Sequence, residues 1–181
     1  NYETIIQSIT AVGNYVYFSN YAPAVYSVNI YYPYFPSVTS YFDAQIPSGY
    51  NWWGKSISIS GTTVFAAYPG KLWLINATDP NSLSELTSYP TGGTAENVTV
   101  KDSILFVAAG PAGLWMLDVS DPYQPETIAN LDSIGFTVDV IVADNLVYVA
   151  SMGVLPDDPL RGVWIINISN PLQPVIVGHH I

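Results

Sequence analysis

The chain has 181 residues, of which only 10% are charged, and 4 basic against 14 acidic side chains give a formal net charge of −10. Such an acidic surface repels nucleic acid and acidic membranes, so we expect no nucleic-acid partner. Cysteine is absent, which excludes disulfides and thiol chemistry, and no apolar run reaches the roughly 18 residues of a membrane helix, so we expect no membrane insertion.

One block of sequence recurs four times and predicts a pair of strands. In each copy, alternating apolar residues stand on both sides of a short pair of turn-forming residues, such as Gly13-Asn14 in the first copy. Alternation of this kind is typical of two β-strands joined by a tight turn. The four copies are ITAVGNYVYFS from Ile9, ISISGTTVFAA from Ile57, VTVKDSILFVA from Val98 and VIVADNLVYVA from Val140.

A second block follows each copy of the first and predicts two more strands. It contains an aromatic anchor, an Asn or Asp three residues later and a proline seven residues later. We expect a third strand ended by a turn, because Asn and Asp side chains cap turns and proline cannot continue a β-ladder. A fourth strand then follows the turn. The anchors are Tyr26, Trp73, Trp115 and Trp164.

The repetition predicts the architecture of the whole chain. The period is about 42–48 residues, in the range of repeat proteins, and no helical period is sustained. We therefore predict an all-β fold, a single β-propeller domain over residues 1–181 with four four-stranded blades. Its inner strands begin near Ile9, Ile57, Val98 and Val140. The repeats cover approximately 1–51, 52–96, 97–138 and 139–181.

The pattern of these blocks resembles the LVIVD repeat family of β-propellers, which is common in secreted and surface proteins of bacteria and archaea. Residues 113–125, GLWMLDVSDPYQP, are most similar to it. The second repeat has Leu83 where the family has its last proline, and the first has Tyr32-Pro33 in place of Asp-Pro. The resemblance implies an extracellular or cell-surface scaffold and no shared catalytic residues.

Residues able to perform chemistry are few. Asp118 shares its repeat position with three Asn residues, and Asp121 shares its position with Asp79 and Asn170, which suits a turn cap better than acid or base catalysis. His179 and His180 are adjacent on the last predicted strand, so their side chains point to opposite faces. We expect no catalytic residues and no cofactor. Asp157 and Asp158 are a weak candidate for a calcium site.

Three sequons are candidates for covalent glycans in a secreted protein, and two of them coincide with the predicted turn caps. A sugar there would decorate the surface. The acceptor residues are Asn76, Asn97 and Asn167.

Aromatic residues are concentrated near the N-terminus. Most of the 14 Tyr, 6 Phe and 5 Trp residues lie within residues 1–53. Tyr31, Tyr32, Tyr34 and Phe35 fall in a predicted turn, where burial within one chain is hard to achieve. We favour a contact with another subunit at these four residues; filling of the core and stacking on carbohydrate are the alternatives.

These observations favour a non-enzymatic extracellular or cell-surface module with a structural or adhesive role. The chain starts and stops at the same phase of the repeat, which fits a closed ring of four blades or one unit of a longer array. A homo-oligomer or polymer, such as a filament or a surface array, is therefore the expected assembly. The alternatives are a lectin-like propeller that binds a glycan or another ligand and, less favoured, a hydrolase or lyase using axial carboxylates.

Overall fold

The computed structural model describes residues 5–20, 24–44, 56–153 and 158–181. The chain divides into two compact units, Asn1–Pro90 and Thr91–Ile181. Each unit is built on two antiparallel β-sheets, and each is described by itself below. Within the described ranges, no helix has the length and apolar character needed to cross a membrane.

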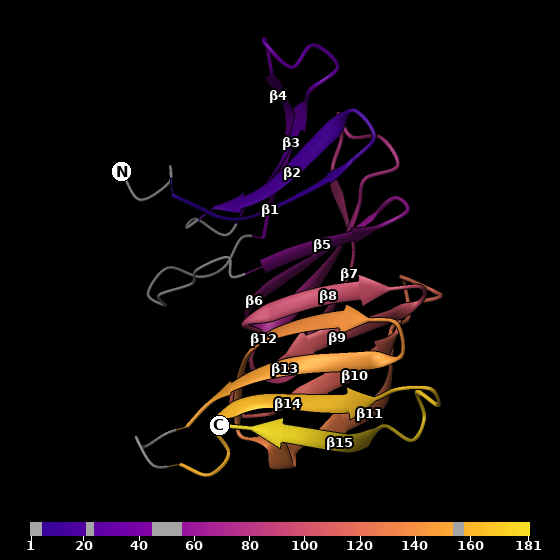
Figure 1. Cartoon of the computed structure of the whole chain (residues 1–181). Helices are drawn as coiled ribbons and strands as arrows, with labels where there is room; N and C mark the ends of the chain where they lie inside the picture. Colours follow the sequence, from indigo (N-terminus) through magenta and orange to yellow (C-terminus); the bar gives the residue numbers. More distant parts are fainter. Residues whose placement is uncertain (1–4, 21–23, 45–55, 154–157) are drawn as a thin grey trace. The chain divides into compact units, whose positions relative to one another are not determined.

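The first unit contains the first and second sheets (Figure 1). Both follow the order of the strands along the sequence, as expected for hairpins in series. The first sheet consists of β1 (Ile6–Val12), β2 (Tyr15–Asn20), β3 (Ala24–Asn29) and β4 (Ser37–Asp43). The second consists of β5 (Ser56–Ser60), β6 (Thr63–Asn76) and β7 (Ser84–Thr94).

Strand β6 covers both the second and the third predicted strands of its sheet. It has 14 residues, and the backbone N–H of Ala77, just after its end, donates to the carbonyl of Thr62, just before its start, at 2.8 Å. The two ends of β6 therefore lie side by side, and the strand reverses within itself. Gly70 has a φ of 80° and permits this reversal. The second sheet thus has the same four positions as the others.

The second unit contains the third and fourth sheets, which are again ordered along the sequence. The only helical segment in the described part of the chain is a 3-10 turn, η2 (Asp132–Ile134). The third sheet consists of β8 (Asn97–Lys101), β9 (Ile104–Ala108), β10 (Leu114–Asp118) and β11 (Glu126–Leu131). The fourth consists of β12 (Phe136–Ala143), β13 (Leu146–Met152), β14 (Gly162–Asn167) and β15 (Val175–His180).

The predicted fold class, an all-β propeller of four blades, is confirmed. The turn between the first two strands of every sheet has a residue with positive φ at the same place: Gly13, Gly61, Asp102 and Asp144. Glycine tolerates this conformation freely and Asp better than most residues, which explains the residue types of the repeat. In each unit the first strands of its two sheets, β1 and β5 or β8 and β12, lie next to each other.

Strand register places the aromatic anchors in equivalent positions. In the fourth sheet, Val140, Val149, Trp164 and His179 are paired in one row across the strands. The first sheet has the matching row of Ile9, Phe18, Tyr26 and Tyr41. We call the face that carries this row the near face of each sheet, and the opposite one the far face.

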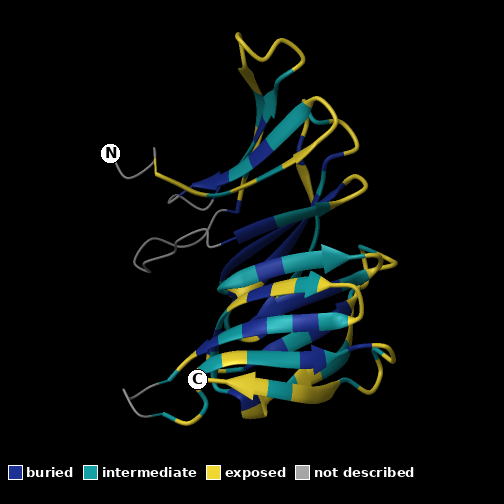
Figure 2. Ribbon diagram, in the orientation of Figure 1, coloured by how far each residue is buried: buried dark blue, intermediate teal, exposed yellow. Residues whose placement is uncertain are grey.

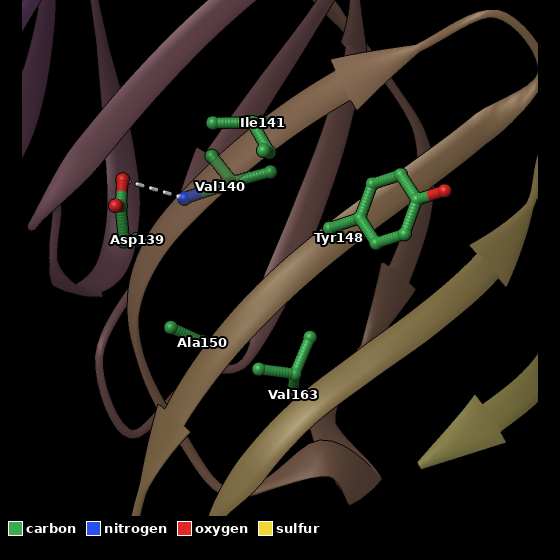
Figure 3. Close-up of a pocket in the computed structure, with 6 residues that line it drawn as sticks. All are labelled: Asp139, Val140, Ile141, Tyr148, Ala150 and Val163. Carbon is green, nitrogen blue, oxygen red and sulfur yellow. Dashed lines mark hydrogen bonds between the residues drawn. The ribbon is translucent and has the colours of Figure 1, made fainter. Parts of the chain in front are cut away.

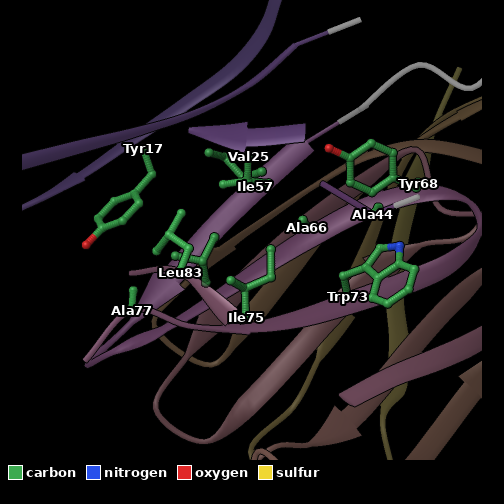
Figure 4. Packing of buried hydrophobic residues seen from close by; sticks show 11 residues of the cluster. Tyr17, Val25, Ala44, Ile57, Ala66, Tyr68, Trp73, Ile75, Ala77 and Leu83 are labelled. Atoms are coloured by element: carbon green, nitrogen blue, oxygen red, sulfur yellow. The ribbon is translucent and has the colours of Figure 1, made fainter. Parts of the chain in front are cut away.

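The two sheets of each unit pack near face against far face. In the first unit, the near face of the second sheet, with Ile57, Ala66 and Trp73, shares a core with Tyr17 and Val25 on the far face of the first (Figure 4). In the second unit, the near face of the fourth sheet shares a core with the far face of the third. Figure 2 shows that buried residues concentrate in β6, β9 and β10.

Candidate functional site

The four aromatic residues predicted to make contacts lie in the turn between β3 and β4, outside the core. Tyr31 is 62% exposed, Tyr32 68%, Tyr34 91% and Phe35 82%. The backbone of the turn is ordered by hydrogen bonds from the N–H of Phe35 to the carbonyl of Tyr32 (2.8 Å) and from the N–H of Tyr31 to Oδ1 of Asn29 (2.8 Å). The rings of Tyr31 and Tyr32 meet edge to face at 4.8 Å. We refer to residues 31–35 as the aromatic turn.

The other three repeats have the same turn, but with a capping Asp or Asn in place of an aromatic residue. The residue at the position of Tyr32 is Asp79, Asp121 or Asn170, and each accepts a hydrogen bond from the backbone N–H two residues later. Tyrosine has no side-chain acceptor at that distance from the backbone, so the first repeat replaces a turn cap with an exposed ring. The residue types of the aromatic turn are therefore not explained by the stability of the turn, since the capping hydrogen bond of the other three repeats is replaced by an exposed ring.

The Asn or Asp three residues after each anchor is a turn cap, as predicted. Its Oδ1 accepts the backbone N–H two residues later at 2.8–2.9 Å in every repeat. In the third repeat the donor is Ser120, and this bond lowers the pKa of the Asp118 carboxyl from its ordinary value of 3.8. The capping residues are Asn29, Asn76, Asp118 and Asn167.

The three sequon residues are all half-buried. In Asn76 and Asn167 the cap uses Oδ1, whereas a glycan would be attached to Nδ2 of the same side chain. Asn97 begins β8 and is paired with Ala108. Glycosylation of these residues stays a prediction.

Only one of the two candidate calcium ligands lies within the described residues. Asp157 lies outside the described residues, and Oδ1 of Asp158 accepts the backbone N–H of Leu160 at 2.9 Å. Within the described ranges, no three His, Cys, Asp or Glu side chains gather in a way that could hold a metal ion. The calcium site remains a prediction.

The two histidines occupy opposite faces, as expected for neighbours on a strand. His179 is paired with Trp164 on the near face, and their rings stack at 3.9 Å. Its Nε2 lies 2.9 Å from the Arg161 carbonyl, which can only accept, so that nitrogen donates. His180 is paired with Val163 on the far face.

A hollow of about 150 Å³ lies on the far face of the fourth sheet (Figure 3). Its lining is mostly apolar and comes from β12, β13 and β14. The one carboxylate, Asp139, accepts the backbone N–H of Val140 at 2.9 Å. The residues that line it are Asp139, Val140, Ile141, Tyr148, Ala150 and Val163. Sequence reasoning did not single out this hollow, since its residues alternate like those of any buried strand.

A second hollow of about 190 Å³ lies among turns of the second unit and is polar. Lys101, Asp102 and Asp144 are among the residues that line it. The Nζ of Lys101 donates to the backbone carbonyl of Asp144, so this cation is engaged in holding two turns together.

Comparison with solved structures shows the fold alone, because sequence identity is low. The crystal structure of the computationally designed Ika4 protein has a TM-score of 0.68 and 11% identity, and the match covers 93% of this chain and 94% of that one. A crystal structure of a protein from Lactobacillus plantarum has a TM-score of 0.75 and 10% identity and matches 92% of this chain. The match spans only 54% of the Lactobacillus protein. None of the curated proteins matches the chain in sequence.

One family matches part of the sequence. Residues 92–132, which contain β8 to β11 and the capped turn at Asp118, match the family described as LVIVD repeat. This segment includes residues 113–125, on which the resemblance rests. Residues 92–132 of this chain are therefore similar to an LVIVD repeat, within a chain that has the fold of a β-propeller.

Proposed function

We propose that the chain is a non-enzymatic structural or adhesive module of an extracellular or cell-surface protein, and that it self-associates into a filament or a surface array. The aromatic turn is the observation that carries this proposal. Its four aromatic side chains are 62–91% exposed, in a turn that in the other repeats carries a capping Asp or Asn.

Exposed tyrosine rings are well suited to contacts with another protein. They bury a large apolar area with few rotatable bonds, and their hydroxyls can still form hydrogen bonds at the edge of a contact. Pro33, within the turn, and Pro36, directly after it, limit the backbone entropy that is lost on docking.

The test is to replace Tyr31, Tyr32, Tyr34 and Phe35 together with serine and to measure the particle mass by light scattering and electron microscopy. The exposed residues contribute little to the core, so the variant should fold like the wild type. We expect its mass to fall from that of large assemblies to the 19.7 kDa of one chain.

The matched control replaces Tyr123 and Leu172 with serine. These residues are 61% and 73% exposed and lie in the equivalent turns of the third and fourth repeats. The control should assemble like the wild type. Assemblies of unchanged size in the aromatic-turn variant would contradict the proposal.

A lectin-like role is the second candidate, because the exposed rings of the same turn offer apolar faces on which a sugar ring can stack. The same variants separate the two roles. A wild-type chain that stays at the mass of one copy and binds a glycan array, with binding lost in the aromatic-turn variant, would favour the lectin.

A further inference from the structure

The polar hollow of the second unit has an apolar interior. It is lined by residues of the third sheet and of two turns of the fourth sheet, so it lies wholly within this unit. Phe106 and Ile168 are buried and Ile104 is half-buried, and all three belong to the core that the two sheets share or pack against it. A ligand that enters the hollow therefore meets apolar side chains.

The rim of the polar hollow is acidic. Asp102 and Asp144 line it, and both are exposed residues of tight turns. The Nζ of Lys101 donates to the backbone carbonyl of Asp144, so the cation of this hollow is already engaged in its wall. Carboxylates can only accept hydrogen bonds, and the rim therefore suits a group that donates one.

The first repeat shows a side chain that suits the same place in a blade. Tyr15 stands where the third repeat has Ile104, because each is paired with the turn cap of its own sheet, Asn29 or Asp118. Tyr15 is half-buried and packs against the core of the first unit. Its hydroxyl accepts a hydrogen bond from Nδ2 of Asn29 at 3.4 Å. In the third repeat the shorter Ile104 takes this place, and the polar hollow lies beside it.

The polar hollow is large enough for a tyrosine ring. Its volume is about 190 Å³. An engineered apolar cavity of roughly 150 Å³ binds benzene, so a phenol ring has sufficient room here. A tyrosine side chain combines the two properties that this hollow suits, an apolar ring for its interior and a hydroxyl donor for its rim.

The aromatic turn offers such a ring without a charge. Tyr34 is 91% exposed, whereas the rings of Tyr31 and Tyr32 are in contact with each other. No residue of the aromatic turn is charged, so the acidic rim does not repel it. With 4 basic against 14 acidic side chains, the chain has few cations for an acidic rim, and an uncharged donor is the complement that it presents most openly.

We propose that Tyr34 of one copy inserts its ring into the polar hollow of a second copy and donates its hydroxyl to Asp102 or Asp144 at the rim. The aromatic turn belongs to the first unit and the polar hollow to the second, so the two contact surfaces differ. Such a head-to-tail contact leads to a ring where the rotation closes and to a filament where it does not. The inference rests on the self-association proposed above and names the surface that receives the aromatic turn.

The first test fills the polar hollow from within. Ile104→Tyr gives the third repeat the residue that the first repeat has at this position, so the strand should form as before. The variant should remain at 19.7 kDa under conditions in which the wild type assembles. Ile104→Leu is the matched control, because the fourth repeat has Leu146 at this position. It leaves the hollow open and should assemble like the wild type.

Mixing two variants tests whether the two surfaces meet. The Ile104→Tyr chain keeps its aromatic turn, and the chain with serine at all four aromatic residues of that turn keeps its polar hollow. An equal mixture should therefore form a heterodimer of twice 19.7 kDa and grow no further. Variants that each stay at the mass of one chain and do not associate with one another would overturn the proposal.

Cross-linking tests the same contact in chains that keep both surfaces. The chain has no cysteine, so Phe35→Cys beside Tyr34 and Ser169→Cys at the hollow each introduce a single thiol. A mixture of the two chains, oxidised with oxidised glutathione, should give a disulfide-linked heterodimer on a non-reducing gel. Ser133→Cys is the control for Ser169→Cys, because Ser133 is exposed and precedes β12, whereas the turn at the hollow follows it. Equal cross-linking at both serine positions would contradict the proposal.

The proposed function and this inference fail in distinguishable ways. Assembly that is lost in the aromatic-turn variant and unchanged in Ile104→Tyr would overturn this inference and leave the proposed function standing. Assembly that persists in the aromatic-turn variant overturns both, as does a wild-type chain that stays at 19.7 kDa at all concentrations.

Discussion

A single side-chain oxygen explains why Asn and Asp alternate at one position of the repeat. In all four repeats, Oδ1 of this residue accepts the backbone N–H two residues later at 2.8–2.9 Å. Either residue type supplies that oxygen, so the position needs an acceptor and not a charge. Only Asp118 adds a negative charge there, and its bond to Ser120 lowers its pKa.

We predict that Asp118→Asn removes a pH-dependent contribution to stability. The pKa of Asp118 is lower in the folded chain than its ordinary 3.8, so the charged form stabilises the fold above that pH and the contribution is lost as pH falls below it. The wild type should therefore melt above the variant near about pH 7, and the difference should shrink toward about pH 3. Thermal melting across this range is the measurement.

The reverse exchange is the control for this prediction. Asn167→Asp introduces the same carboxylate at the equivalent cap of the fourth repeat, where Ser169 donates at 2.8 Å. It should gain the pH dependence that Asp118→Asn loses. A difference in melting temperature between the wild type and Asp118→Asn that does not change with pH would show that the charge of Asp118 contributes nothing to stability.

At the scale of elements, Gly113 sets how closely β10 can approach its neighbour β11. Its φ is 75°, and a Cβ at this position would lie 2.1 Å from the carbonyl oxygen of Leu131. Gly162 has the same role at the start of β14, where a Cβ would lie 2.1 Å from the carbonyl oxygen of His180. The glycine at the start of the GLWMLDVSDP block is therefore required by contact with the fourth strand as well as by backbone conformation.

We predict that Gly113→Ala lowers the free energy of unfolding by about 1–3 kcal/mol through overpacking, in addition to the strain of its positive φ. Gly13→Ala is the control, because Gly13 also has a positive φ, of 56°, but a Cβ there would meet nothing within 4 Å. Denaturant unfolding of both variants separates the clash from the strain. Equal losses in the two variants would show that the contact with Leu131 has no cost.

The strands and turns were predictable from sequence because they depend on local patterns. Gly13 and Asp144 lie at positive φ in the predicted turns, and the aromatic turn stood out because it broke the repeat. The reversal within β6 was not predictable. Gly70, where the strand reverses, lies between the two repeated blocks, and the sequence pattern predicts no turn there.

For the whole molecule, the net charge opposes association with another copy. Each chain carries −10 with only 4 basic side chains, so two chains repel one another at long range. The four side chains of the aromatic turn are exposed and carry no charge. Assembly is therefore a balance of apolar burial against repulsion that salt can screen.

We predict that added sodium chloride strengthens assembly. Between about 0.02 M and about 0.5 M salt, the screening length falls from roughly 20 Å to roughly 4 Å, which removes most of the repulsion between exposed charges. The protein concentration at which half of the chains are assembled, measured by light scattering, should fall as salt is added. The variant with serine at Tyr31, Tyr32, Tyr34 and Phe35 should stay at the mass of one chain throughout, because screening cannot restore its lost apolar contact. If salt instead dissolves the assemblies, ion pairs and not apolar side chains hold the copies together, and the proposed contact through the aromatic turn is wrong.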